Sequence, residues 1–104
     1  LMLANGKGVA QDYKAAARWY RIEAGNGNPD AQFNLGLMYL FGIGVDTDHS
    51  IGEKWIYMAG QTYADQGRWK RVLESIDAIK IFNDENPLAK KLYKEMYNGE
   101  AKAY

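Results

Sequence analysis

The chain has 104 residues, of which 47% are hydrophobic and 25% are charged, and this composition excludes disordered and fibrous proteins. Its 13 basic and 13 acidic residues cancel, so no net charge attracts nucleic acid or an anionic membrane surface. The absence of cysteine excludes disulfides and cysteine-ligated zinc, and no apolar run approaches the roughly 20 residues that a membrane-spanning helix needs.

A repeat with a period of 36 residues organises the first two thirds of the chain. The turn sequence Gly6-Lys7-Gly8-Val9 recurs as Gly42-Ile43-Gly44-Val45. The same offset relates further matching pairs: Met2 and Met38, Asp12 and Asp48, Trp19 and Trp55. Periods of this size are typical of proteins built from stacked helical hairpins.

The first repeat unit predicts the end of one helix and the whole of the next. We expect Leu1–Ala4 to end the first helix, and Asp12 to cap a second one that stops at the turn Gly25-Asn26-Gly27-Asn28. Alanines on the second helix allow a neighbouring helix to approach closely. We predict that Trp19 and its equivalent Trp55 fill the space between hairpins with large apolar side chains.

The second unit predicts a complete hairpin. Pro29–Tyr39 begins with a proline that suits a first helical turn, and its apolar residues follow at helical spacing. The glycines of Gly42-Ile43-Gly44-Val45 end this helix, and Asp48 offers side-chain oxygens to the first N–H groups of the next. We predict one long helix over residues 48–66, shared between this hairpin and the following one.

The last third of the chain predicts a different hairpin, because the 36-residue register fails after Trp55. Residues 69–82 carry apolar side chains at three- and four-residue spacing, and the turn formers of residues 83–86 end that helix. Pro87 opens a final helix that we expect to end at Asn98-Gly99, with fraying beyond it. Its charged side is typical of a capping element.

Three segments carry a resemblance to a known family: Asp12–Tyr20, Ala31–Tyr39 and Gly42–Val45. They closely resemble the Sel-one-like repeat, a relative of the tetratricopeptide repeat, with a departure at Ser50-Ile51-Gly52, where Lys-Ala-Ala is usual. The resemblance implies an all-α protein, an α-α superhelix in which antiparallel helix pairs form a right-handed solenoid. We predict a single helical-repeat domain over residues 1–104, divided into a partial first unit (1–28), a second unit (29–62), and a divergent tetratricopeptide-like hairpin with a capping helix (63–104).

The chemistry-bearing residues do not form a convincing catalytic or metal site. His49 stands close to Asp46 and Asp48, but helix capping by Asp48 explains the same residues more simply. A calcium loop fails at Ile51 and Tyr57, where glycine and glutamate are required. The Gly-x-Gly pairs follow helices and lack the Gly-Lys-Ser/Thr ending of a phosphate-binding loop. We therefore predict no catalytic residue, no metal and no cofactor, and we expect the chain not to be an enzyme.

The resemblance implies a scaffold or adaptor that binds a partner peptide or protein on the concave surface of the superhelix. The candidate partner-binding residues are those expected to face inward on that surface: Asp30, Phe33, Leu37, Leu40, Lys54, Tyr57 and Gln61. For Phe33 and Leu37, packing against a neighbouring helix is an equally open alternative.

Two other functions stay open at this point. The chain could be a non-catalytic regulatory or structural region of a larger protein whose activity lies elsewhere, or it could self-assemble through its ends. Basic residues beside aromatic ones at 68–71 and 90–94 are balanced by nearby acidic residues, which favours a solvated surface. We therefore predict a protein or peptide partner, and neither nucleic acid nor membrane.

Overall fold

The computed structural model describes the backbone of residues 9–103 and the side chains of residues 12–99, and these residues form five helices and no strand. The helix predicted to end at Leu1–Ala4 lies outside the described residues. The five helices are α1 (Val9–Gly25), α2 (Pro29–Phe41), α3 (His49–Asp65), α4 (Trp69–Ile79) and α5 (Pro87–Ala103).

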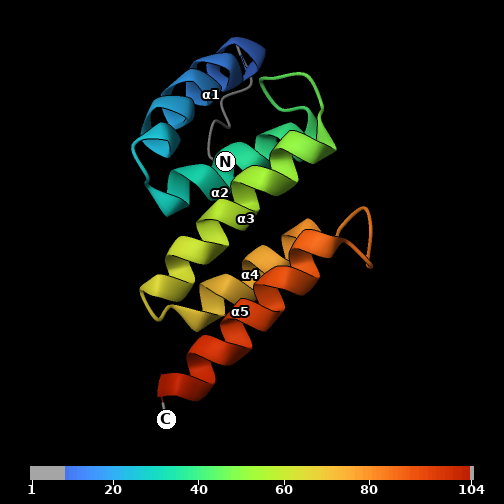
Figure 1. Cartoon of the computed structure of the whole chain (residues 1–104). Helices are drawn as coiled ribbons and strands as arrows, with labels where there is room; N and C mark the ends of the chain where they lie inside the picture. Colours follow the sequence, from blue (N-terminus) through green and yellow to red (C-terminus); the bar gives the residue numbers. More distant parts are fainter. Residues whose placement is uncertain (1–8, 104) are drawn as a thin grey trace.

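The helices pack in series, each against the next along the chain, as Figure 1 shows. The long helix α3 also contacts α5, so it holds the two hairpins together and is shared between them, as the sequence predicts. The resulting molecule is elongated, with principal extents of 50 × 26 × 20 Å. The chain is all-α, and its helix pairs form the predicted α-α superhelix.

Short polar side chains cap the starts of α2 and α3. The side chain of Asn28 accepts hydrogen bonds from the backbone N–H groups of Asp30 and Ala31, and Pro29 occupies the first turn of α2. The side chain of Asp48 accepts a hydrogen bond of 3.0 Å from the N–H of Ile51, which confirms the predicted cap of α3. These bonds satisfy backbone donors that have no partner inside the helix.

The predicted cap of α1 is wrong, because that helix begins three residues earlier. α1 starts at Val9, and Asp12 lies within its first turn instead of before it. A carboxylate in a first turn is favourable there, since it faces the positive end of the helix dipole.

Glycines set how closely helices approach at the centre of the molecule. A Cβ atom added to Gly52 on α3 would lie 2.7 Å from the backbone oxygen of Gly36 on α2, so the two helices cross with their backbones nearly in contact. Gly60 on α3 leaves room for the side chain of Leu92 on α5, which a Cβ atom at Gly60 would overlap. The departure from the family at Gly52 is therefore a packing feature.

Gly44 brings the turn of the second unit against the backbone of the first. Its φ of 73° lies in the left-handed region. A Cβ atom at this position would also overlap the backbone carbonyl of Tyr13 in α1. Glycine is required here both by the backbone conformation and by the close approach of another chain segment.

The predicted role of the two equivalent tryptophans is correct for Trp55 and wrong for Trp19. Trp55 packs, partly buried, against a cluster that contains Ala24, Ala31 and Leu35. Trp19 is 59% exposed. The physical reason is that α1 buries Ala17, and a residue two positions later points about 200° away around the helix.

Both helices of the last hairpin differ from prediction at their ends. α4 stops at Ile79, so the predicted continuation to Phe82 is wrong, and residues 80–86 form the connection to α5. α5 runs on to Ala103, so the predicted end at Asn98-Gly99 is also wrong. The helix continues through Gly99 although glycine has a low helix propensity, and the indole of Trp69 lies beside this position.

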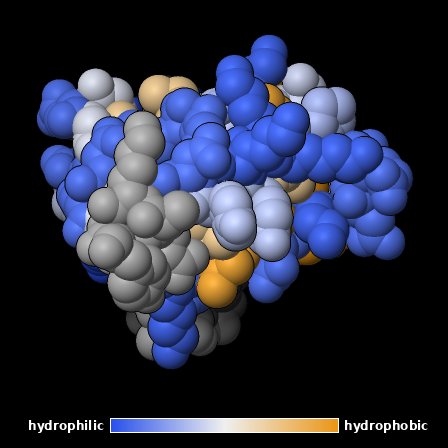
Figure 2. All heavy atoms as spheres, turned by 60° about the horizontal axis from the view of Figure 1, so that its bottom comes forward, coloured by the Kyte–Doolittle hydropathy of each residue, from blue (hydrophilic) through white to orange (hydrophobic). Residues whose placement is uncertain are grey.

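The surface at the α5 end of the molecule is mostly hydrophilic, with hydrophobic residues only in small patches (Figure 2). The exposed residues of α5 include three lysines and two tyrosines: Lys90, Lys91, Lys94, Tyr93 and Tyr97. A polar outer surface is what the last helix of a solenoid requires. The assignment of α5 as a capping helix stays a prediction.

Candidate functional site

The seven predicted partner-binding residues do not share one surface. Asp30 and Phe33 of α2 both contact Arg71 of α4. Phe33 and Leu37, one helical turn apart, also pack partly buried against the hydrophobic core. Tyr57 and Gln61 lie on the side of α3 that faces α5, and Lys54 is exposed one turn before them.

Leu40 is the most deeply buried of the seven candidates. Its side chain is only 1% exposed and lies in the hydrophobic core. It packs at the crossing of α2 and α3, where a Cβ atom on Gly52 would be 3.0 Å from Leu40 Cγ. The prediction that Leu40 faces a partner is therefore wrong.

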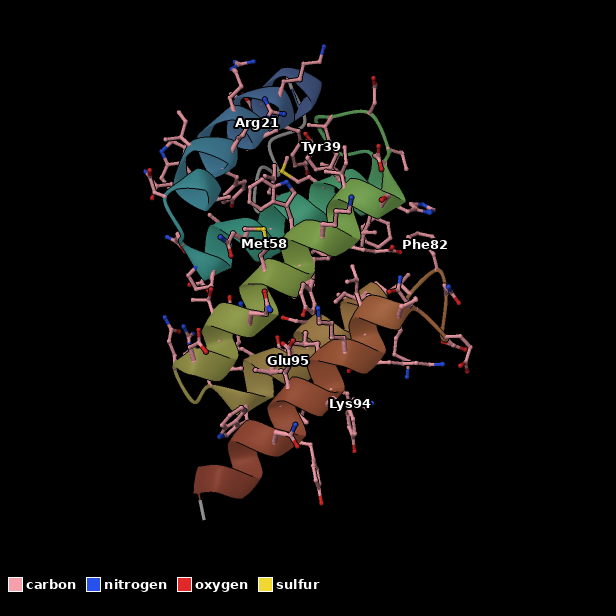
Figure 3. All side chains as sticks on the ribbon, viewed as in Figure 1. Arg21, Tyr39, Met58, Phe82, Lys94 and Glu95 are labelled. Atoms are coloured by element: carbon pink, nitrogen blue, oxygen red, sulfur yellow. The ribbon has the colours of Figure 1, made fainter. Side chains whose placement is uncertain are left out.

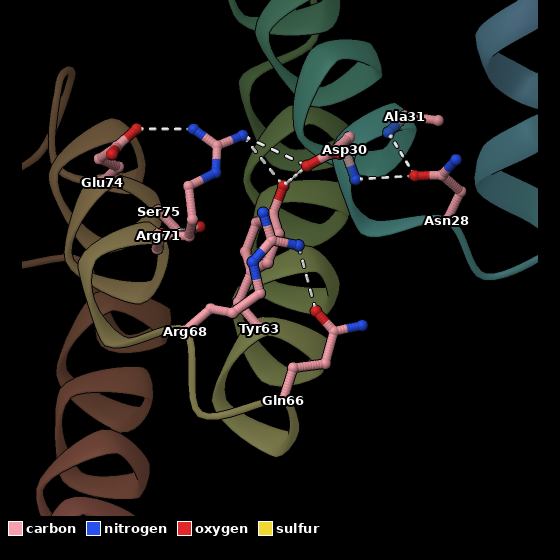
Figure 4. Close-up of polar contacts among 9 residues, drawn as sticks. All are labelled: Asn28, Asp30, Ala31, Tyr63, Gln66, Arg68, Arg71, Glu74 and Ser75. Atoms are coloured by element: carbon pink, nitrogen blue, oxygen red, sulfur yellow. Dashed lines mark hydrogen bonds and ion pairs between the residues drawn. The ribbon is translucent and has the colours of Figure 1, made fainter.

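A network of charged and hydroxyl groups joins α2, α3 and α4 (Figure 4). The Tyr63 hydroxyl donates a hydrogen bond to the Asp30 carboxylate. The Arg71 guanidinium donates to the Tyr63 hydroxyl oxygen at 3.1 Å and to Asp30 at 3.4 Å. It also pairs with Glu74 at 2.7 Å. Arg71 is thus held from three sides.

The network shifts the pKa values of its members in the directions that keep it intact. The hydrogen bond from Tyr63 lowers the pKa of Asp30, with a further contribution from Arg71. Burial, followed by the hydrogen bond to Asp30, raises the pKa of Tyr63 to about 12. Asp30 is consequently ionised and Tyr63 neutral throughout the physiological range.

An apolar row continues from this network along α2. Phe33, Leu37 and Phe41 follow one another at four-residue spacing, and the Arg71 guanidinium lies 5.3 Å from the centre of the Phe33 ring. Phe41 is 48% exposed, and its ring centre is 5.7 Å from that of Phe82, which is 47% exposed. The exposed end of the row is therefore Phe41, and it lies next to a second exposed aromatic ring, that of Phe82.

His49 extends the aromatic end of this row. Its ring stacks on Phe82 with centres 4.0 Å apart and planes inclined by 11°. We call the surface formed by the network and the row the α2–α4 face, defined by Asp30, Phe33, Leu37, Phe41, Arg71 and Phe82. Phe82 is labelled in Figure 3, where it lies in the connection between α4 and α5.

The two candidates on the other side of α3 form a second, smaller network with α5. The Tyr57 hydroxyl donates a hydrogen bond of 2.7 Å to Glu95, and Gln61 Nε2 donates to the Tyr57 hydroxyl at 3.1 Å. Burial raises the pKa of Tyr57 to about 12, and the hydrogen bond to Glu95 adds to the shift. Tyr57 is a buried anchor between two helices and presents little surface to a partner.

Four residues of the α2–α4 side were missed by the sequence analysis: Phe41, Arg71, Glu74 and Phe82. Phe41 could have been found, because it continues the four-residue spacing of Phe33 and Leu37. The others come from α4 and the connection after it, and the repeat register that relates the hairpins fails in that part of the chain.

The described part of the chain contains no group of three or more histidine, cysteine, aspartate or glutamate side chains arranged to hold a metal ion. Its helices also include none that is long and apolar enough to cross a membrane. The arrangement of Asp30, Arg71 and the aromatic row offers charge and apolar area for contact with another molecule.

Comparisons with known proteins match the repeated part of the chain. The profile of the Sel1 repeat matches residues 1–27 and 29–61. The human protein called Protein sel-1 homolog 2 is 40% identical over 61 residues, which are 58% of this chain and 9% of that protein. The chain thus spans about a tenth of the length of this relative. No solved structure matches this chain.

Proposed function

The chain belongs to the Sel1 repeat family, and on that premise we propose that its α2–α4 face binds a partner peptide or protein. Sel1 repeats are in general protein-interaction modules, and the family is typically a non-catalytic scaffold. We propose the same non-catalytic role for this chain. The partner is a protein or a peptide, held without any cofactor.

The observation that carries the proposal is the exposed aromatic end of the row. Phe41 and Phe82 are about half exposed although each has an aromatic neighbour within 6 Å. Exposed aromatic residues are enriched among those that supply most of the energy of protein contacts. A fixed ion pair at the other end of the row, between Asp30 and Arg71, adds orientation and specificity more than affinity.

The dimensions of the row favour a helical partner. Phe33 and Phe41 are separated by two turns of α2, a rise of about 12 Å. An amphipathic helix that presents apolar side chains at four-residue spacing matches this length and periodicity. A donor or acceptor near one end of that helix would meet the charged groups around Arg71.

A paired-variant experiment tests the proposal. Proteins captured by the chain are identified, the partner is purified, and its binding is measured by calorimetry. We expect the double variant Phe41→Ser, Phe82→Ser to lose most of the affinity, since both side chains are exposed and their loss leaves the core intact.

The matched control replaces two aromatic residues of α5 that are somewhat more exposed than Phe41 and Phe82: Tyr93→Ser and Tyr97→Ser. This control should bind like the unchanged chain. Equal affinity for all three proteins, with circular dichroism showing that each is folded, would move the partner site away from the α2–α4 face.

A second candidate function follows from the coverage of the relative. The chain matches only 9% of that protein, so it can also act as a non-catalytic regulatory or structural region within a longer chain. In that case the Phe41 and Phe82 variants would leave partner capture unchanged, while removal of the repeats would lower the stability of the longer protein.

A further inference from the structure

A second feature of the surface, away from the α2–α4 face, is a hollow of about 500 Å³ around the C-terminal half of α3. Met58 of α3 and Glu95 of α5, both labelled in Figure 3, lie on its wall. We call it the acceptor hollow. The described residues that line it are Gln32, Met58, Gln61, Thr62, Ala64, Asp65, Trp69, Glu95 and Gly99.

The charges on this lining are all negative. Asp65 and Glu95 contribute carboxylates, and the described lining contains no lysine or arginine. Glu95 Oε1 accepts the hydrogen bond from Tyr57, but Oε2 accepts only a long contact of 3.5 Å from Gln61. A carboxylate oxygen has two lone pairs, so the hollow retains unused capacity to accept hydrogen bonds.

A buried amide oxygen beside the hollow points to the same kind of ligand. Gln32 is only 3% exposed, and its Nε2 donates a hydrogen bond of 3.1 Å to the backbone oxygen of Ala24. Its Oε1 has no hydrogen-bond donor among the described residues. Because a buried acceptor without a donor is unfavourable, a small movement of this side chain that brings Oε1 to an N–H group of a ligand in the hollow would be favoured.

Two large apolar side chains of the wall suit a flat cation. Met58 is 44% exposed, and the indole of Trp69 also lines the hollow. A guanidinium group stacks on aromatic faces and presents five N–H donors in a fixed plane, whereas an ammonium group is a compact and strongly hydrated charge. We propose that the acceptor hollow binds an arginine side chain of a partner protein.

A small probe tests this inference without the unidentified partner. N-acetyl-arginine amide is titrated into the isotope-labelled chain, and the side-chain amide signals of Gln32 and Gln61 are followed by NMR. Both signals should shift with one saturating curve. The lysine analogue should bind more weakly, and the citrulline analogue, which has nearly the same shape but no charge, should cause no saturating shift.

Matched variants separate the hollow from general charge attraction. Glu95→Gln keeps the shape and the acceptor for Tyr57 but removes the charge, and it should weaken arginine binding roughly fivefold. Asp77→Asn removes an exposed carboxylate of α4 that does not line the hollow, and it should leave binding unchanged. If circular dichroism shows that Glu95→Gln is unfolded, Asp65→Asn takes its place.

Three results would overturn the inference: a citrulline response equal to that of arginine, shifts that spread over the surface without saturating, or equal effects of Glu95→Gln and Asp77→Asn. The probe carries no large apolar group for the aromatic row. If the probe does not bind the hollow, the proposed function of the α2–α4 face is therefore unaffected. Conversely, the Phe41 and Phe82 variants do not test binding to the hollow.

Discussion

The buried hydroxyl of Tyr63 on α3 donates a hydrogen bond to the carboxylate of Asp30 at the start of α2. The two residues are 33 positions apart, and their bond ties the beginning of one helix to the end of the next. Arg71 of α4 donates to the same hydroxyl oxygen, so one phenol group connects three helices.

Replacing this phenol should lower stability without opening a large cavity. We expect Tyr63→Phe to reduce the free energy of unfolding by about 1–2 kcal/mol, because Asp30 and Arg71 each lose a partner. The pKa of Asp30 should rise toward its ordinary value. Urea denaturation and carboxyl NMR measure the two effects. Tyr97→Phe, which alters an exposed tyrosine, is the control and should change stability by less than about 0.5 kcal/mol.

Alkaline pH should destabilise the protein through its two buried tyrosines. Tyr57 and Tyr63 have pKa values raised from 10.0 to about 12, mainly by burial. A raised pKa in the folded state means that the stabilisation is complete below about pH 10 and is lost as the pH rises toward 12. Denaturation followed across this range should show the fall, and Tyr63→Phe should show a shallower one.

Acidic pH should weaken the network of Asp30, Tyr63 and Arg71 by protonating Asp30. The pKa of Asp30 lies below its ordinary value of 3.8 in the folded chain. A lowered pKa means that its stabilisation is present above that ordinary value and is lost as the pH falls through the folded value. Asp30→Asn should remove this part of the acid dependence. An unchanged acid profile in that variant would show that other carboxylates dominate.

The crossing of α2 and α3 should not tolerate a side chain. Gly52→Ala places a Cβ atom 2.7 Å from the backbone oxygen of Gly36, so the helices must separate, and we expect a loss of about 1–3 kcal/mol. Gly25→Ala is the matched control, because nothing lies within 4 Å of its Cβ position. Thermal denaturation of both variants should show a lower midpoint for Gly52→Ala alone.

The last helix should unfold together with the rest of the chain. Leu92 of α5 is fully buried beside Gly60 of α3, and Leu92→Ala should cost about 2–5 kcal/mol. Leu73→Ala, at a half-exposed position of α4, should cost much less. A small effect at Leu92 with a separate early transition would mean that α5 opens independently of the other helices.

The hairpins could be predicted from local signals, because capping and helix ends depend on neighbouring residues. The local signals for α2 and α3 are Pro29, the glycine turn and Asp48, and each marks a helix start or end within a few residues of its own position. The structure has helix ends where these signals indicate them. The ends of α4 and α5 were less predictable. Gly99 lies beside Trp69, thirty positions away, and no local rule contains that contact.

The partner surface was only partly predictable, because periodicity shows which residues share a side of a helix but not what that side faces. Leu37 and Leu40 are three residues apart, and the rotation of about 60° between them decides the outcome. Leu37 is only partly buried against the core, whereas Leu40 is fully buried at the crossing with Gly52. Arg71 belongs to the divergent hairpin, where no repeat register indicates its position.

The close approach of Gly44 to the carbonyl of Tyr13 also determines which substitutions the repeat packing can tolerate. The spacing between the first helix and the next turn is set by two main chains, with no side chain between them. Side chains on the exposed surfaces can therefore be exchanged without altering the rise from one unit to the next. Substitutions at exposed positions away from Gly44 and Tyr13 should therefore leave the packing of this turn on α1 unchanged.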